Sequence, residues 1–266
     1  MKRVQISVVV AFVALSAQIA LAQGTGAARF QQVLEVNVKP GQELVYENYI
    51  KKVVAAADKA GAKQTWTAYS VTLGKPGATY RVALGFNSWG ERDGWNTVPA
   101  ILAKAYGQAE AERLMKEGGS ATERSVSEVW ENLPDLGTTV AAAAGATPPS
   151  VVRVQVTRIQ PSMSTAYEAL LAKFKPAYQA ATGQPGVGRS ILRMGQFSGS
   201  TYRRTQQFNK WSDLDAPSGV ALLQKHFGAQ FPPMIDELRK MIVSQLEFVS
   251  TRRADLSRNG VVTSTR

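Results

Sequence analysis

The sequence predicts an α+β protein in which one β-α-β-β-α-β module occurs twice in the chain. "TYRVALGFNSWGERD", which begins at Thr79, and "TYRRTQQFNKWSDLD", which begins at Thr201, share the pattern T-Y-R-x4-F-N-x-W-x3-D. Segments on both sides of this pattern repeat as well. Ordered matches of this kind indicate an internal duplication. We assign the modules to residues 28–137 and 150–256.

The flanking matches extend the duplication over most of the chain. Before the shared pattern, "KPGQELVYENYIKK" (39–52) matches "QPSMSTAYEALLAK" (160–173). After it, "AKAYGQA" (103–109) matches "QKHFGAQ" (224–230). The order of the matches is the same in both halves, so both halves should share one topology.

The first module begins with a strand and a helix. Residues 33–38 alternate apolar and polar side chains, which is the period of a half-buried strand. Pro40 and the glycine after it predict a turn. Apolar residues then recur at helical spacing over 42–60, and Gly61 ends this helix.

A hairpin, a second helix and a last strand complete the first module. The segments 63–74 and 79–86 are rich in Thr, Tyr and Val, and "GKPG" (74–77) predicts the turn between them. Residues 99–118 predict one helix that begins at a proline, a residue suited to a first helical turn. Residues 122–131 predict the closing strand.

The second module repeats this order. Helices are predicted over 164–182, where Pro176 could introduce a kink, and within about 220–242. Strands are predicted over four segments: 151–156, 187–194, 201–208 and 243–250.

The β-α-β-β-α-β order is that of the ferredoxin-like motif, whose sheet carries helices on one face only. The other face must be covered, because apolar surface would otherwise stay in contact with water. We therefore expect the two modules to pack sheet to sheet as an α+β barrel within one chain. Residues 138–149 are rich in Ala, Gly, Thr and Pro and predict a linker, and residues 257–266 predict a flexible tail.

The first residues have the pattern of a secretory signal peptide. Lys2 and Arg3 precede a short apolar run, and "ALA" (20–22) is a small-residue cleavage site. We expect residues 1–22 to be removed and the chain to be periplasmic or secreted, without a membrane segment after cleavage. A retained anchor is the alternative.

Composition narrows the possible partners. The formal charge is +11, which favours anionic partners. The basic residues are scattered and do not alternate with aromatic ones, so we expect no nucleic-acid binding. The chain has no cysteine and one histidine, which excludes the common zinc ligand sets, and no metal site is predicted.

The chain resembles a tandem form of the dimeric α+β barrel superfamily. The resemblance rests on the β-α-β-β-α-β order, the F-N-x-W at the end of the third strand, and the K-x-[YF]-G pattern in the following helix. This superfamily includes antibiotic-biosynthesis-type monooxygenases, NIPSNAP-type proteins and haem-degrading relatives. The resemblance implies a cavity between the two sheets and a monomer with a pseudo-two-fold axis. It does not identify a cofactor.

The repeated Asn and Trp of the shared pattern are candidate site residues. In haem-degrading relatives, Asn, Trp and His converge in the barrel, so the resemblance implies a catalytic set of Asn209, Trp211 and His226, with Asn87 and Trp89 as ligand-binding residues. The alternative is structural: the Trp caps the barrel end, and the Asn turns the chain into the next segment.

His226 is the only histidine, and a histidine can ligate haem or exchange a proton near neutral pH. Its counterpart in the first module is Ala105, so chemistry that needs histidine would be confined to the second module. A surface or core histidine is the alternative.

Arginines in the second hairpin form the other candidate site. We place Arg203 on one face of its strand, with Arg189 and Arg193 of the neighbouring strand, and add Tyr202 and Arg204 from the opposite face. Charges in mid-strand are costly if they are buried without partners. These residues could therefore bind an anionic ligand, for which arginine is well suited, or belong to a solvated surface with ion pairs.

The sequence favours an exported protein that binds a small molecule, anionic or aromatic, in the barrel. One alternative is a cofactor-free monooxygenase or haem-related enzyme with its site in the second module. Another is a protein-interaction module that binds through its outer helices.

Overall fold

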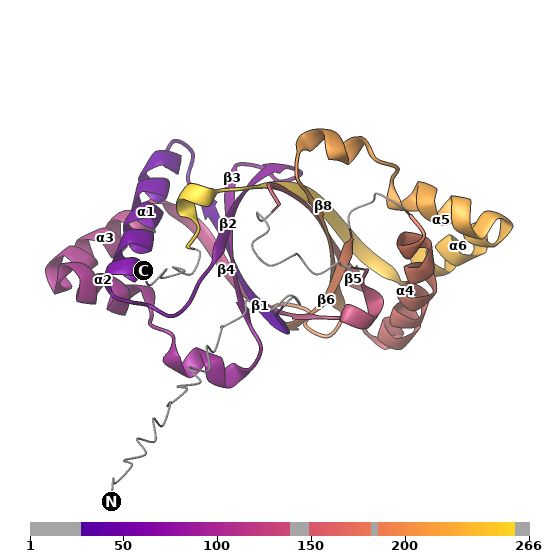
Figure 1. Ribbon diagram of the computed structural model, residues 1–266, viewed down its shortest axis with the longest axis horizontal. Coiled ribbons are helices and arrows are strands. Elements are labelled where there is room, and N and C mark those ends of the chain that lie inside the picture. The colour runs from indigo at the N-terminus through magenta and orange to yellow at the C-terminus, as the bar shows by residue number, and fades with distance from the viewer. Residues whose placement is uncertain (1–27, 139–148, 182–185, 259–266) are drawn as a thin grey trace, which may run out of the picture.

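Eight strands of the described residues form one closed barrel, and helices cover it on two opposite sides (Figure 1). The computed structural model describes residues 28–138, 149–181 and 186–258. The predicted signal peptide (1–22), nearly all of the predicted linker and residues 259–266 lie outside this range. None of the helices in the described ranges combines the length and apolar character needed to cross a membrane.

The first module has the predicted order of elements, with one difference. Its elements are β1 (Phe30–Val38), α1 (Glu43–Lys59), β2 (Thr67–Leu73), β3 (Ala78–Phe86), α2 (Val98–Tyr106), α3 (Gln108–Ala121) and β4 (Thr122–Asn132). The prediction of a single helix over 99–118 is wrong. Gly107 has a φ of 88°, a conformation that glycine adopts readily, and there the chain changes direction between α2 and α3.

The second module repeats this arrangement, including the divided helix. Its elements are β5 (Val151–Ile159), α4 (Ser164–Gln179), β6 (Val187–Met194), β7 (Thr201–Phe208), α5 (Gly219–Phe227), α6 (Phe231–Met241) and β8 (Ile242–Arg252). Gly228, with a φ of 53°, follows α5 as Gly107 follows α2. Pro176 lies inside α4, as predicted.

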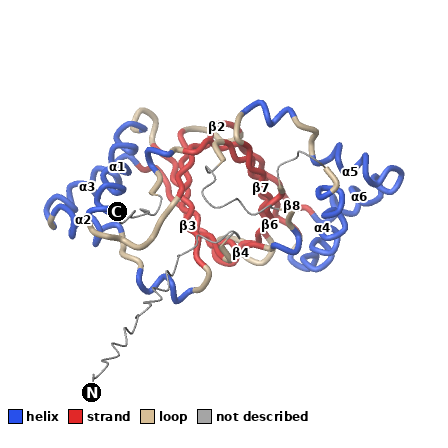
Figure 2. The backbone as a smooth tube through the Cα atoms, in the orientation of Figure 1, coloured by secondary structure: helices blue, strands red, loops and turns tan. Residues whose placement is uncertain are grey.

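The two sheets join edge to edge, in the order β1-β3-β2-β8-β5-β7-β6-β4. The seams between the modules are the antiparallel pairs β2–β8 and β4–β6, and β4 pairs back with β1 to close the barrel. Figure 2 shows the strands as a ring with helices to either side. Closure leaves none of the eight described strands with a free edge. The prediction that the modules cover each other as an intrachain α+β barrel is confirmed.

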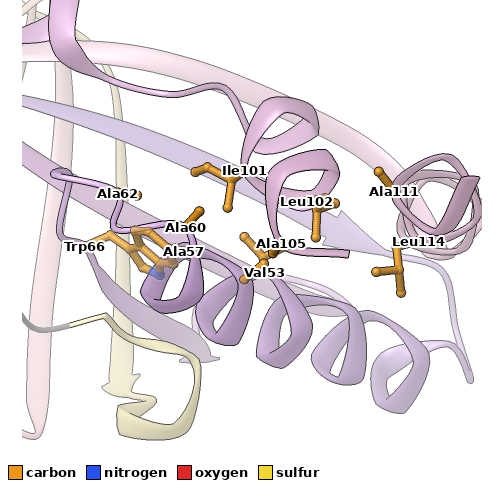
Figure 3. Close-up of a cluster of buried hydrophobic side chains, with 11 residues drawn as sticks. Val53, Ala57, Ala60, Ala62, Trp66, Ile101, Leu102, Ala105, Ala111 and Leu114 are labelled. Carbon is orange, nitrogen blue, oxygen red and sulfur yellow. The ribbon is translucent and has the colours of Figure 1, made fainter. Parts of the chain in front are cut away.

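Apolar residues on one face of each sheet pack against that module's own helices. In the first module, a cluster at the centre of the helical layer includes Val53, Trp66, Ile101, Leu102 and Leu114 (Figure 3). In the second module, a matching cluster forms around residues of α4 such as Leu170 and Phe174. The helices therefore account for one face of each sheet, and the other face lines the barrel lumen.

The end of each module packs against the helices of the other. The turn Pro134–Leu136 follows β4 and contacts α4, and the turn Ala254–Leu256 follows β8 and contacts α1. Leu256 is only 1% exposed. These crossed contacts add to the seams in holding the two modules together.

The predicted flexible tail is wrong for its first two residues, Ser257 and Arg258, which are buried. The backbone of Arg258 forms two hydrogen bonds of 2.9 Å with Trp66. Its side chain donates to Asp58 at 2.7 Å. These residues extend the contact of the second module with the first.

Candidate functional site

The lumen holds a cavity of about 220 Å³ towards one end of the barrel. Strand alternation explains which side chains reach it: on β1, Val36 packs towards α1, whereas Glu35 and Asn37 point inward. The charged lining residues are Glu35, Lys75, Arg81, Arg124 and Glu128. All of them come from the first module, although the sequence pattern favoured a site in the second.

The second module contributes mainly apolar wall. It contributes Val156, Leu246 and Phe248 together with Gln196, and the first module adds the uncharged residues Asn37, Val126 and Trp130. Lys75 and Gln196 lie in the two hairpin turns of the modules, and both turns reach the same cavity. The site therefore combines a charged side with an apolar side.

Arg81 is the central charged residue of the cavity. Its side chain is buried, and the residue is 8% exposed. Its Nε lies 3.4 Å from Glu35 Oε2 but has no hydrogen-bond acceptor among the described residues. The guanidinium carbon lies 4.8 Å from the centre of the Phe248 ring. Burial lowers the pKa of Arg81, because the charged form loses hydration.

Lys75 and Glu35 stand beside Arg81. The Lys75 ammonium group pairs with Glu35 and lies 4.7 Å from the centre of the Phe248 ring. One carboxylate therefore faces two cations. The second carboxylate of the cavity, Glu128, accepts a hydrogen bond of 3.1 Å from the Trp130 indole.

Arg203 lies inside the barrel next to this cavity and is 4% exposed. Its Nε donates to Ser190 Oγ at 3.0 Å, and its guanidinium carbon lies 4.7 Å from the centre of the Trp130 ring. Burial, with a further contribution from the charge of Arg81, lowers the pKa of Arg203 to about 9. The charge of Glu128 opposes this shift. Repulsion between two buried arginines favours a third, negatively charged partner.

The charges of the site do not balance. Lys75, Arg81, Arg124 and Arg203 outnumber the carboxylates of Glu35 and Glu128. A surplus of positive charge in a partly enclosed, weakly hydrated space attracts anions. What the arrangement can do chemically is hold and neutralise a small anion against an apolar wall.

The structure divides the predicted arginine set between two faces of the sheet. Arg203 pairs in register with Ser190, and both side chains face the lumen. Arg189 pairs with Arg204 on the opposite face, towards the helices. Placing Arg189 and Arg193 with Arg203 on one face is therefore wrong. The prediction had placed β6 one residue out of register with β7, and a shift of one residue exchanges the two faces of a strand.

Arg193 and Tyr202 have local partners outside the lumen. Arg193 forms an ion pair of 2.6 Å with Glu131 across the β4–β6 seam. The Tyr202 hydroxyl donates to Glu168 at 2.7 Å, just as the hydroxyl of its counterpart Tyr80 donates to Glu47 at 2.6 Å. Neither Arg193 nor Tyr202 lines the cavity.

The repeated Asn and Trp lie where β3 and β7 end. Asn87 Oδ1 accepts from the backbone N–H of Arg29 at 3.1 Å, and its own N–H donates to Glu91 at 2.9 Å. Trp89 is 45% exposed and its ring packs beside Phe86. These contacts fit the structural interpretation, in which the motif turns the chain out of the strand.

The second copy of the motif has the same character. The N–H of Asn209 donates to Asp213 at 3.2 Å, and Trp211 is 42% exposed. His226 is exposed on α5, and its ring contacts Phe227. None of Asn209, Trp211 and His226 lines the cavity.

Haem does not fit the residues of this cavity. Haem iron takes an axial His, Cys, Met or Tyr, and none of these side chains is among the cavity-lining residues. Within the described part of the chain, no group of three or more His, Cys, Asp or Glu residues could hold a metal ion. We derive no chemistry that depends on either group.

Sequence reasoning missed Arg81, Lys75, Arg124 and both carboxylates. The signal for Arg81 was present, because it is the arginine of T-Y-R and the counterpart of Arg203. The polar residues Glu35 and Asn37 alternate with apolar ones, and this pattern is the same for a strand that faces water and one that faces a polar lumen.

Comparisons with known proteins support the fold. A structure from Lactobacillus acidophilus NCFM, described as monooxygenase-like, aligns with a TM-score of 0.51 at 11% identity, over 87% of this chain and 96% of its own. A second monooxygenase-like protein, from Fusobacterium nucleatum, aligns with a TM-score of 0.51 at 11% identity, over 88% of this chain and 95% of its own. An anthrone oxidase-like protein also aligns with a TM-score of 0.51 at 11% identity, over 86% of this chain and 93% of its own. No family model matches the chain, and no curated protein matches it either.

Proposed function

We propose that this chain, which has the dimeric α+β barrel fold, binds a small anionic molecule in the barrel lumen. The observation that carries the proposal is Arg81: a buried guanidinium group in the cavity wall whose Nε has no described hydrogen-bond acceptor. The Nε is ion-paired with Glu35 but donates no hydrogen bond. A buried donor without a hydrogen bond costs free energy, which a bound anion would recover.

The lining indicates how the ligand would be held. A carboxylate or similar group would accept hydrogen bonds from Arg81 and Lys75, because guanidinium and ammonium groups form strong, charge-assisted hydrogen bonds. The remaining part of the ligand would lie against Val156, Leu246 and Phe248. The cavity is smaller than the roughly 300 to 1,000 Å³ of pockets for drug-sized ligands, so the proposed ligand is a compact one.

The monooxygenase descriptions of similar structures do not extend to a reaction here. At 11% identity the likeness shows the fold alone. The residues lining the cavity include neither histidine nor cysteine, and the Glu35 carboxylate already forms an ion pair with Lys75. Binding is therefore the function that the geometry supports best.

We also propose that residues 1–22 direct export, on the basis of their charged start, apolar run and small-residue site. Expression in a bacterium followed by fractionation tests this proposal. The expected product is a periplasmic or secreted chain that begins at Gln23. An uncleaved product in the cytoplasm would contradict it.

The binding proposal is tested by calorimetric titration of the chain with acetate, benzoate and inorganic phosphate. We expect at least one anion to bind, and Arg81→Met to weaken its affinity by about tenfold or more, the effect of losing a charged hydrogen bond. Arg113→Met is the matched control, because Arg113 pairs with Glu110 on the outer surface of α3. Equal affinity in Arg81→Met and wild type, or no binding of any of the three anions, would overturn the proposal.

A further inference from the structure

We propose a second site, for a small oxyanion, between the sheet and helices of the second module, with Arg189 and Arg204 as its binding residues. It lies on the opposite face of the sheet from the lumen, because Arg204 and Arg203 are successive residues of β7. The site is independent of the lumen site proposed above.

The clearest evidence is the difference between the two modules at matching positions. In the second module, Arg189 and Arg204 are directly opposite each other on neighbouring strands. In the first module, the corresponding pair is Ala68 and Val82. Ala68 is buried, and Val82 packs against the helical core. The same position in the same fold is thus apolar in one module and doubly positive in the other.

Both arginines have buried nitrogen atoms without a hydrogen bond to the described part of the chain. Arg189 Nε, Arg204 Nε and Arg204 Nη2 are buried atoms without a hydrogen-bond partner in the described residues. Neither arginine forms an ion pair with a described carboxylate. The nearby Glu247 instead accepts hydrogen bonds from Arg153 at 2.8 Å and Gln155 at 3.1 Å. Like charges directly opposite in a sheet repel, so this pair destabilises the sheet unless an anion lies between the arginines.

Elements above the pair bring further donors close. The Arg204 guanidinium carbon lies 5.3 Å from the centre of the Tyr178 ring on α4. The first residue of α5 is Gly219, where an added Cβ would lie 2.7 Å from Arg204 Nη2 and 3.0 Å from the Tyr178 hydroxyl. A glycine here lets the positive end of the α5 dipole approach the arginine closely. Burial lowers the pKa of Arg204, and the charge of Arg189 adds to this effect.

The surroundings define the class of ligand. Two adjacent guanidinium groups, a helix N-terminus and a tyrosine hydroxyl together supply donors and positive charge, which matches an anion with two or more acceptor oxygens. Phosphate and carboxylate groups both have this chemistry. Inorganic phosphate and acetate, used as separate probes, distinguish them.

The test uses the first module as the template for a variant. In a background of Arg81→Met, which removes the lumen site, Arg189→Ala with Arg204→Val recreates the residues of the first module. We expect phosphate or acetate to raise the melting temperature of the background protein. In the double replacement, the response to the same anion should be lost, while the melting temperature without anion stays equal or rises.

A second variant separates binding from folding. Gly219→Ala keeps every charge but places a methyl group against Arg204, so affinity for the anion should fall by about tenfold while Gly219→Ala still folds. Three outcomes would overturn the proposal: no response of the background protein to either anion, an unchanged response in the double replacement, or a large loss of stability when both arginines are removed. The two sites fail in different ways: failure of the lumen site would appear as equal anion binding by wild type and Arg81→Met, whereas failure of this second site would appear within the Arg81→Met background.

Discussion

Arg81 and Arg203 occupy the same position of the duplicated T-Y-R pattern, and both side chains are buried inside the barrel. Each lies over an aromatic ring, Arg81 over Phe248 and Arg203 over Trp130. Burial and the charge of Arg81 together lower the pKa of Arg203 to about 9. The duplication therefore places two cations in one lumen, where they repel each other.

This relationship predicts that Arg203→Met stabilises the ligand-free protein. Replacing a buried ion pair by apolar residues of similar volume is often neutral or stabilising by about 1 to 4 kcal/mol. Arg203 forms no ion pair with a described carboxylate, so its removal leaves no buried partner charge behind. We expect a gain near the lower end, about 1 kcal/mol, because Arg203 also bonds to Ser190. Urea unfolding without added anions measures it, and Arg113→Met serves as the control. A loss of more than about 1 kcal/mol would show that Arg203 is structural.

Removing the hydroxyl from the tyrosine of each T-Y-R copy should lower the unfolding free energy by unequal amounts. Tyr202→Phe should cost about 1 kcal/mol of unfolding free energy, because Tyr202 is the one described donor to Glu168. Tyr80→Phe should cost less, because Glu47 keeps its bonds to Arg253. Chemical denaturation of both variants tests the order. Equal losses, or a larger loss at Tyr80, would contradict this explanation.

The crossed contacts between modules predict that Leu256→Ala destabilises the whole protein. Leu256 is 1% exposed and packs on residues of the first module, such as Tyr46. Truncation of a buried leucine to alanine costs about 2 to 5 kcal/mol. Thermal unfolding should show one transition at a lower temperature. Val220→Ala, at an exposed position of α5, is the control. Two separate transitions, or no shift, would indicate that the modules fold independently.

Acid should weaken the contact between the end of the second module and α1 of the first. Hydrogen bonds from Arg253 lower the pKa of Glu47, and they lower the pKa of Asp255 to about 2. A carboxyl group whose pKa is lowered by folding stabilises the protein above its unfolded pKa, and this stabilisation is lost as pH falls through the folded value.

The unfolding free energy should therefore decrease between about pH 4 and pH 2, by less in Arg253→Met than in wild type. Urea unfolding at several pH values over this range measures the difference. The same pH dependence in both proteins would show that these carboxyl groups do not stabilise the contact.

The topology could be predicted because the two copies of the module provide independent evidence for the same order of elements. Each strand inferred from one copy had a counterpart in the other, and the uncovered sheet face required a partner. The break at Gly107 was not predicted, because residues 99–118 were interpreted as one helix. The positive φ of Gly107, which separates α2 from α3, is a property of the backbone that a lone glycine in the sequence does not establish.

The site was harder to predict than the fold. Arg203 was placed on one face of its strand from alternation alone, and the structure shows that this face is the lumen. The partner of Arg203 depends on strand register, which the sequence of β6 does not fix, so Arg189 was assigned to the wrong face. Lys75 lies in a turn and Arg124 on a strand of the opposite seam, so no local pattern could bring them together.

Anomalous scattering from crystals of the chain soaked in bromide would show directly whether the barrel lumen binds an anion. We expect a bromide peak in the barrel lumen within contact distance of Arg81 and Lys75, and its loss in crystals of Arg81→Met. A lumen without bromide, in crystals whose surface sites are occupied, would contradict the claim that the barrel binds small anions.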